Sequence, residues 1–332
     1  MNFIKEEYMV KLCNRDKRGW EKIYMKLFVI GNGFDLAHGL KTKYEDFREY
    51  LEEYGEKFLY DLEGMYGFCR ESNRECIKKC LWEKFEKNLS YINDAEIIDF
   101  ATGIEMLLEG GDIGIEDTLN AYWEEQYGFI KNLNCYIKSW IEKIDLNINR
   151  KSKIISEELN DLFLTFNYTL VLENVYGIDN NSILHIHGSV DGKHDYEPVI
   201  GHGEYSKIYE MKQRAYDASE KFLEKETSIY NAIASYYERT LKDVQHFIKI
   251  NNNFFIRLED ITEIFIVGHS LGEVDMPYFQ KIKDNVNDGI KWNVTYYEES
   301  DIDKHKNSIL SLGVKEENIC MLHTDEFFKL QR

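Results

Sequence analysis

The sequence contains very little proline and no long apolar run. Only 2 of its 332 residues are Pro, and it has no Pro/Gly/Ser-rich stretch, which excludes an extended flexible linker. No segment approaches the roughly 18–20 uninterrupted apolar residues of a membrane span. Residues 1–22 also lack the apolar core of a signal peptide. These absences predict a folded cytoplasmic protein with no membrane partner.

Cysteine and basic residues are also scarce. The 6 Cys are irregularly spaced and form no paired C-x-x-C ribbons, so we expect free thiols in a reducing cytosol. Cys69, Cys76 and Cys80 form the only cluster, for which a metal site is the alternative interpretation. The formal charge of -19 and the absence of Lys and Arg from residues 91–130 argue against a broad nucleic-acid surface.

Short apolar runs typical of buried strands recur along the chain. They occupy residues 26–31, 162–166, 183–186 and 264–267. A fifth segment, 292–297, alternates and is rich in β-branched and aromatic residues, as expected of a strand nearer an edge. Because helical stretches separate them, they predict an α/β fold with a Rossmann-like parallel sheet. Four of the runs end in polar and glycine residues. In an open α/β sheet, ligands bind at the carboxyl ends of the strands, so these four motifs predict a nucleotide-type site.

The spacing of the strands predicts one α/β domain over residues 25–332. Met25 directly precedes the first strand, so residues 1–24 are expected to be an appended N-terminal arm or the product of an upstream start site. A large helical insertion is predicted at about 45–155, between the first and second strands. A second helical stretch is predicted from about Glu204 to Lys249.

The first motif is Gly31-Asn32-Gly33-Phe34-Asp35. Two glycines allow a tight turn whose backbone amides can point at a phosphate, and such amides bind anions without a lysine. The Asp35 carboxylate is a candidate to bind a ribose hydroxyl. The alternative is an ordinary strand-to-helix turn with Asp35 as a cap.

The last motif is Gly268-His269-Ser270-Leu271-Gly272, which matches the G-x-S-x-G nucleophile elbow of α/β-hydrolases. Only one clear strand is expected after Ser270, whereas that fold needs several. We therefore interpret the motif as a second glycine turn that holds the other half of a nucleotide. Asp275, with Pro277 behind it, is expected to cap the following helix.

Two further motifs carry candidate catalytic groups. In Thr165-Phe166-Asn167-Tyr168-Thr169, the Asn167 amide can orient a sugar or a water molecule, or Asn167 or Thr169 can cap a helix. In His185-Ile186-His187-Gly188, strand spacing places both imidazoles on one face, and His187 is a candidate general base. A metal site completed by His202 or His194 is the alternative.

These four motifs together resemble the bacteriophage abortive infection AbiH family, in order from about Lys26 to the C-terminus. The resemblance implies a bacterial phage-defence protein. A more distant resemblance to sirtuin-like NAD-binding domains implies Asn167 and His187 as catalytic residues, and glycine turns that hold the pyrophosphate. The four-cysteine zinc module of sirtuin deacylases is absent, which argues against deacylation. The predicted nucleotide-binding residues are Gly31, Asn32, Gly33, Asp35, Gly188, Gly268, Ser270 and Asp275.

The resulting functional hypothesis is an NAD-consuming glycohydrolase that cleaves the nicotinamide–ribose bond. NAD would be its substrate, and no metal is expected, because the cationic pyridinium is already a good leaving group. One alternative is a nucleotide-binding sensor of a defence system that performs no catalysis. Another is a metal-dependent nuclease built on His185, His187 and His202. A homo-oligomer or a phage-derived trigger is a further candidate partner.

Overall fold

The described part of the chain contains a six-stranded parallel sheet. The structure, a computed structural model, describes residues 25–103, 121–157, 160–191 and 197–331, so the predicted arm at 1–24 lies outside it. The strand order is β3-β2-β1-β4-β5-β6, and every neighbouring pair is parallel. The strands are β1 (Met25–Ile30), β2 (Leu162–Thr165), β3 (Ile183–His185), β4 (Ile261–Val267), β5 (Lys291–Tyr296) and β6 (Ile319–His323). The predicted α/β class is confirmed.

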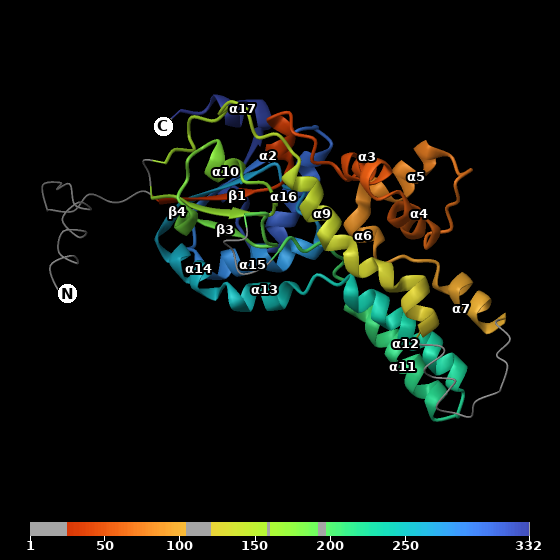
Figure 1. Ribbon diagram of the computed structural model, residues 1–332. Helices are drawn as coiled ribbons and strands as arrows, with labels where there is room; N and C mark the ends of the chain where they lie inside the picture. Colours follow the sequence, from red (N-terminus) through yellow and green to blue (C-terminus); the bar gives the residue numbers. More distant parts are fainter. Residues whose placement is uncertain (1–24, 104–120, 158–159, 192–196, 332) are drawn as a thin grey trace, which may run out of the picture.

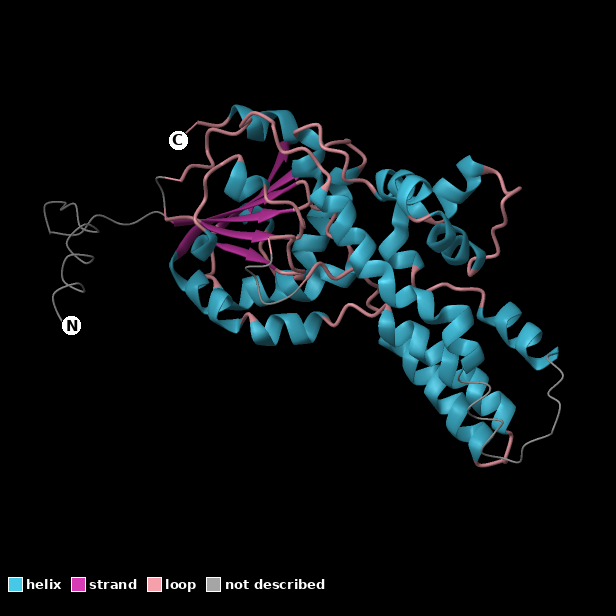
Figure 2. Ribbon diagram, viewed as in Figure 1, coloured by secondary structure: helices cyan, strands magenta, loops and turns pink. Residues whose placement is uncertain are grey.

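Both faces of this sheet are apolar, which explains the uninterrupted apolar runs of its strands. Leu27 and Val29 of β1 pack into the core on one face, whereas Phe28 and Ile30 pack into the core on the other. Helices cover both faces (Figures 1 and 2). The first face carries α13 (Val244–Ile250), α14 (Asn252–Ile256), α15 (Met276–Asn285) and α16 (Asp301–Ser311). The second carries α2 (Asn32–Ala37), α10 (Val171–Asn174) and α17 (Thr324–Lys329).

The strand order reverses between β1 and β4, which lie side by side at the centre of the sheet. This is the order of dinucleotide-binding α/β folds, whose ligands bind at the reversal point. Two strands, β5 and β6, follow Ser270 instead of the one predicted. Strand β6 is a short edge strand whose residues are all half-buried, and its apolar pattern is correspondingly weak.

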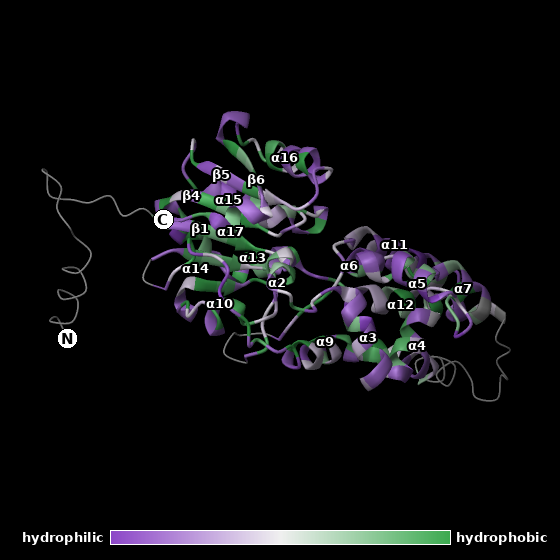
Figure 3. Cartoon of the chain, turned by 90° about the horizontal axis from the view of Figure 1, so that it is seen from above, coloured by the Kyte–Doolittle hydropathy of each residue, from purple (hydrophilic) through white to green (hydrophobic). Residues whose placement is uncertain are grey.

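A helical lobe lies to one side of the sheet in both views of the molecule (Figures 1 and 3). The described residues between β1 and β2 are largely helical, as predicted for this part of the chain. Its helices are α3 (Tyr44–Tyr54), α4 (Glu56–Gly64), α5 (Arg74–Cys80), α6 (Phe85–Asn88), α7 (Asp94–Gly103) and α9 (Leu133–Glu142). In the described ranges no helix has the length and apolar character needed to span a membrane.

A second segment of the chain also forms part of the lobe. The predicted helical stretch from Glu204 to Lys249 is confirmed, and its first two helices are α11 (Tyr205–Ser219) and α12 (Glu224–Arg239). These pack with the insertion in one hydrophobic core, in which Phe47 and Trp82 share a cluster with Ile229 and Tyr236. The lobe is thus assembled from two insertions, one on each side of β2 and β3 in sequence.

Candidate active site at the sheet edge

The two glycine turns meet at the reversal point between β1 and β4. The amide of Gly31 donates to Val267 O at 2.9 Å, and the amide of Gly33 donates to Gly268 O at 2.8 Å. A Cβ atom on Gly33 would lie 2.7 Å from the Gly268 Cα. The close approach of two backbones therefore requires glycine here. Both amides therefore donate within the fold and are not free to point at a phosphate, contrary to the prediction for this turn. Nucleotide binding by the motif through its other groups stays a prediction.

The Ser270 turn is open to solvent. Ser270 is exposed, whereas His269 is buried and its Nδ1 accepts a hydrogen bond from the Leu271 amide at 2.9 Å. Leu271 has a φ of 51°, an unusual conformation for a residue with a Cβ. Helix α15 begins only at Met276, so Ser270 does not sit on the sharp strand-to-helix turn of a nucleophile elbow.

Asp35 anchors a first group of buried polar residues, which we call the Asp35 cluster. Its members are Asp35, Asn167, Thr169, Glu173 and His185. Thr169 Oγ1 donates to Asp35 Oδ2 at 2.6 Å, and Asn167 Nδ2 donates to Gly31 O at 3.2 Å. Neither residue caps α10, whose N-cap is Leu170, so the capping interpretation was wrong. His185 Nδ1 donates to Asn167 O at 2.9 Å and its Nε2 lies 2.8 Å from Glu173 Oε1.

The Asp35 carboxyl has an unusual environment for an acidic group. Burial raises its pKa to about 7, against the opposing effect of the Thr169 hydrogen bond and the nearby Asn167 amide. Its Oδ1 and the Oε2 of Glu173 are buried, and neither has a hydrogen-bond partner among the described residues. Buried polar atoms normally have partners, so two orphan oxygens in one cluster mark a place where polar groups are held for a reason other than packing.

Asp275 is the centre of a second group, which we call the Asp275 cluster. Its members are Glu86, His187, Lys242, His269 and Asp275. Asp275 Oδ1 lies 3.1 Å from Lys242 Nζ, and Asp275 Oδ2 lies 3.5 Å from His269 Nε2. His187 Nε2 lies 4.0 Å from Asp275 Oδ1 and 3.1 Å from the hydroxyl of Tyr278 on α15. The second oxygen partner of Lys242 is Glu86 Oε2 of the helical lobe, at 2.7 Å.

The charges of the Asp275 cluster are fixed by their mutual contacts. Burial raises the pKa of Asp275, but the Lys242 ammonium and a hydrogen bond from His269 outweigh this effect and hold the pKa well below its ordinary value. Burial lowers the pKa of Lys242, but Asp275 and Glu86 outweigh it in turn and raise this pKa. The pKa of His187 lies well below its ordinary value, first because of burial and then because of Lys242. At neutral pH the cluster therefore presents an ionised Asp275 beside a neutral His187.

Asp275 occupies the N-cap position of α15, as predicted, with Pro277 in the first turn. Its side chain makes no cap hydrogen bond, and the carboxylate turns to Lys242 and His269 instead. Sequence reasoning missed Lys242 and Glu86, because neither lies in a motif and their partners are far away along the chain.

The structure places the two predicted catalytic residues in different clusters. Asn167 belongs to the Asp35 cluster and His187 to the Asp275 cluster. The ring of Phe166, the residue before Asn167, packs against His187 and His269 of the Asp275 cluster with centroid distances of 5.3 and 4.3 Å. Both clusters lie at the carboxyl edge of the sheet, so an extended ligand is needed to reach both.

His185 and His187 do not share a face, contrary to the strand-spacing prediction. Strand β3 ends at His185, and the Gly188 amide closes a turn on His185 O at 3.1 Å, with a Gly188 φ of 83°. The turn directs His185 toward α10 and His187 toward α15, on the opposite face of the sheet. Period-two spacing does not hold beyond the end of a strand.

The three histidines of the nuclease alternative are also dispersed. His202 Nε2 donates to Tyr237 O at 3.1 Å, and its Nδ1 accepts from the Glu204 amide at 3.0 Å. His194 lies outside the described residues. Across the described ranges, no group of three or more His, Cys, Asp or Glu side chains is arranged to hold a metal ion. Cys69, Cys76 and Cys80 are free thiols.

One known protein family matches most of the chain. A model of the family described as "Bacteriophage abortive infection AbiH" matches residues 27–296, a range that contains all four motifs and both clusters. The chain belongs to the AbiH family. Membership in this family supports a bacterial anti-phage role by abortive infection. No curated protein and no solved structure matches the chain.

Proposed function

We propose that this AbiH-family chain is an NAD glycohydrolase that acts in phage defence. The observation that carries the proposal is the pairing of a neutral His187 with an ionised Asp275, within 4.0 Å of each other, at the carboxyl edge of the sheet. The strand order of this sheet is the one that binds dinucleotides, and its reversal point lies at the adjacent glycine turns. Together they provide a candidate base and counter-charge beside a candidate dinucleotide site.

The chemistry needs few groups. The bond between ribose C1′ and the nicotinamide nitrogen breaks, its electron pair leaves with nicotinamide as a neutral molecule, and a water oxygen forms the new bond to C1′. His187 accepts the proton of this water as general base. The ionised Asp275 stabilises the positive charge that develops on the ribosyl carbon and then on the imidazole. Lys242 keeps Asp275 ionised and fixed in position.

The remaining predicted residues supply binding. Asn167 would hold a ribose hydroxyl, because its side chain lies at the end of β2 next to the β1 turn. The exposed Ser270 hydroxyl and the backbone of Gly268 would contact the phosphates, with Gly188 leaving room beside His187. Gly31, Asn32 and Gly33 would shape the turn that the pyrophosphate approaches. In this proposal Asp35 lies behind Asn167 and orients it.

One observation favours a second function, a nucleotide sensor without catalysis. His187 is only 3% exposed and His269 only 6%, so a substrate reaches them only after local opening of the edge. A protein that binds a dinucleotide at the surface of this edge, through the Ser270 turn, needs no such opening. Binding and turnover therefore have to be measured separately.

The deciding experiment measures both quantities in one preparation. The full chain is incubated with NAD, released nicotinamide is followed by chromatography, and NAD binding is measured by calorimetry. We expect release by the wild type and none by His187→Ala or Asn167→Ala. His246→Ala is the matched control, because His246 is an exposed histidine of α13 outside both clusters, and it should retain full release.

Each outcome has a definite meaning. Nicotinamide release at wild-type rates by a folded His187→Ala variant would show that His187 is not the base. Tight NAD binding without release, in the wild type and after addition of phage lysate, would support the sensor. The absence of both binding and release would contradict both functions.

A further inference from the structure

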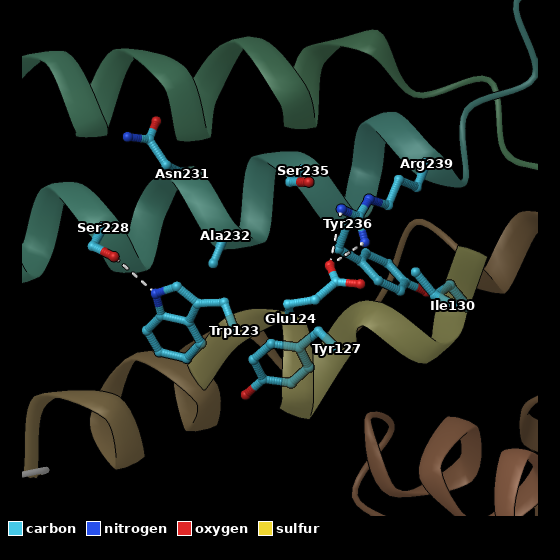
Figure 4. A pocket seen from close by; sticks show the side chains of 10 residues that line it. All are labelled: Trp123, Glu124, Tyr127, Ile130, Ser228, Asn231, Ala232, Ser235, Tyr236 and Arg239. Atoms are coloured by element: carbon cyan, nitrogen blue, oxygen red, sulfur yellow. Dashed lines mark hydrogen bonds and ion pairs between the residues drawn. The ribbon is translucent and has the colours of Figure 1, made fainter. Parts of the chain in front are cut away.

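The helical lobe contains a pocket of its own, separate from the sheet edge. Its volume is about 290 Å³, and it lies between α12 and the segment that carries Trp123 and Tyr127 (Figure 4). Its α12 wall is formed by Ser228, Ala232 and Ser235. These three residues follow a spacing of four and three, so they share one face of the helix. The pocket exists because small side chains on this face leave room opposite two large rings.

The opposite wall is a rigid aromatic surface. The Trp123 and Tyr127 rings are stacked, with centroids 5.7 Å apart and an interplanar angle of 16°. Trp123 Nε1 donates to Ser228 Oγ at 2.8 Å, which fixes the indole against α12. A flat aromatic wall facing a row of small residues suits a planar ring system, because stacking needs a ring face and little depth.

One end of the pocket carries a cation that is only loosely held. Arg239 NH1 and NH2 lie 3.5 and 3.4 Å from Glu124 Oε2, longer than usual N–H···O hydrogen bonds. Lys131 also pairs with Glu124, so the carboxylate keeps a partner if Arg239 turns away. Arg239 is 40% exposed along its side chain, where such ion pairs contribute little. Its guanidinium is thus available to an anionic group, which it can hold in a bidentate manner.

We propose that this pocket binds a mononucleotide, with its base against Trp123 and Tyr127 and its phosphate on Arg239. The volume of about 290 Å³ lies just below the range for ligand pockets, which begins at about 300 Å³. It fits one ring system with a single substituent and is too small for a dinucleotide. The inference therefore concerns a second site and does not depend on NAD cleavage at the first.

The test titrates the full chain by calorimetry with AMP, GMP, CMP, UMP, adenosine and inorganic phosphate, each alone. At least one mononucleotide should bind more tightly than about 1 mM, and phosphate alone should not. Ala232→Leu, which fills the pocket, should abolish this binding, and Ala232→Ser, which keeps the position small, should preserve it. Arg239→Gln should weaken the nucleotide about tenfold or more, while leaving adenosine unchanged.

Three results would overturn the proposal. The first is the failure of all four nucleotides to bind. The second is equal binding of phosphate alone, which would leave the aromatic wall without a role. The third is nucleotide binding that survives Ala232→Leu but is lost in His187→Ala, which would place the ligand at the sheet edge. Comparison of these two variants therefore distinguishes binding in the pocket of the lobe from binding at the sheet edge.

Discussion

The ammonium group of Lys242 lies 3.1 Å from Asp275 Oδ1, although the side chain of Lys242 is only 1% exposed. The same nitrogen lies 2.7 Å from Glu86 Oε2. Glu86 belongs to α6 in the helical lobe and Asp275 precedes α15 against the sheet, so Lys242 joins the two parts of the molecule. It is also three residues beyond Arg239, the last residue of α12 and part of the mononucleotide pocket proposed above.

Replacing Lys242 by Met should destabilise the protein strongly. The substitution leaves the half-buried carboxylates of Asp275 and Glu86 without the buried cation that pairs them, for which the expected loss is up to about 3–5 kcal/mol of unfolding free energy. Urea unfolding followed by circular dichroism measures it. Lys306→Met, which removes an exposed partner of Glu316, is the control and should leave the unfolding midpoint nearly unchanged.

The effect of Lys242→Met should also depend on pH. In the wild type the pKa of Asp275 is held below its ordinary value of 3.8, so this group stabilises the fold above that pH and loses its contribution as the pH falls through the lowered value. The difference between the two proteins should therefore be largest above pH 5 and shrink toward pH 3. A difference that grows as the pH falls would contradict the assignment of the ion pair.

The contribution of Asp35 to stability should have the opposite pH dependence. Its pKa is about 7 in the folded protein and 3.8 as the ordinary value, so between these values the unfolded chain loses this proton while the folded chain keeps it. Stability from this group is complete below pH 3.8 and declines as the pH rises to about 7. Asp35→Asn cannot ionise, so its stability relative to wild type should increase from pH 5 to pH 8. Thermal unfolding at both pH values tests this, and a constant difference would show that Asp35 ionises normally.

Because the two glycine turns are in contact, Gly33 should not tolerate replacement by a residue with a Cβ atom. A Cβ atom there would meet the Gly268 backbone at 2.7 Å, so the turns must separate. Gly33→Ala should cost about 1–3 kcal/mol of stability. Gly64→Ala, in α4, is the matched control, because no atom lies within 4 Å of the added Cβ. Chemical unfolding of both variants should show a loss only for Gly33→Ala.

The proposed glycohydrolase activity should persist into the acidic range. Burial and Lys242 keep the pKa of His187 well below its ordinary value of 6.5, so the imidazole stays available as a base below that pH. In a profile of kcat/KM against pH for nicotinamide release, the midpoint of the acidic limb should lie clearly below pH 6.5. A limb centred at or above pH 6.5 would assign the titrating base to another group.

The local sequence predicted the strands that carry the site. Five of the six strands were placed within a few residues, because four contain short apolar runs buried on both faces and the fifth alternates with β-branched and aromatic residues. The half-exposed edge strand Ile319–His323 was not predicted, because it lacks that pattern. The four motifs were correctly located at strand ends, since a strand end is a local property of the chain.

Side-chain partners were harder to predict than positions. The sequence placed His185 and His187 on one face by strand spacing, but the chain turns after His185 and sends them to opposite faces. It interpreted Asp275 as a helix cap, although a distant lysine holds the carboxylate. In both cases a local rule was outweighed by a contact between segments far apart along the chain.

The sequence by itself therefore determined the α/β class, the helical character of the insertions and the location of the polar residues at the sheet edge. These follow from hydrophobic periodicity and glycine turns, which act over a few residues. Only the tertiary structure decided that two insertions share one lobe, that Asn167 and His187 lie in separate clusters, and that Lys242 pairs with Asp275 and Glu86. A buried lysine carries no local signature, because its position is set by two carboxylates that reach it only when the chain is folded.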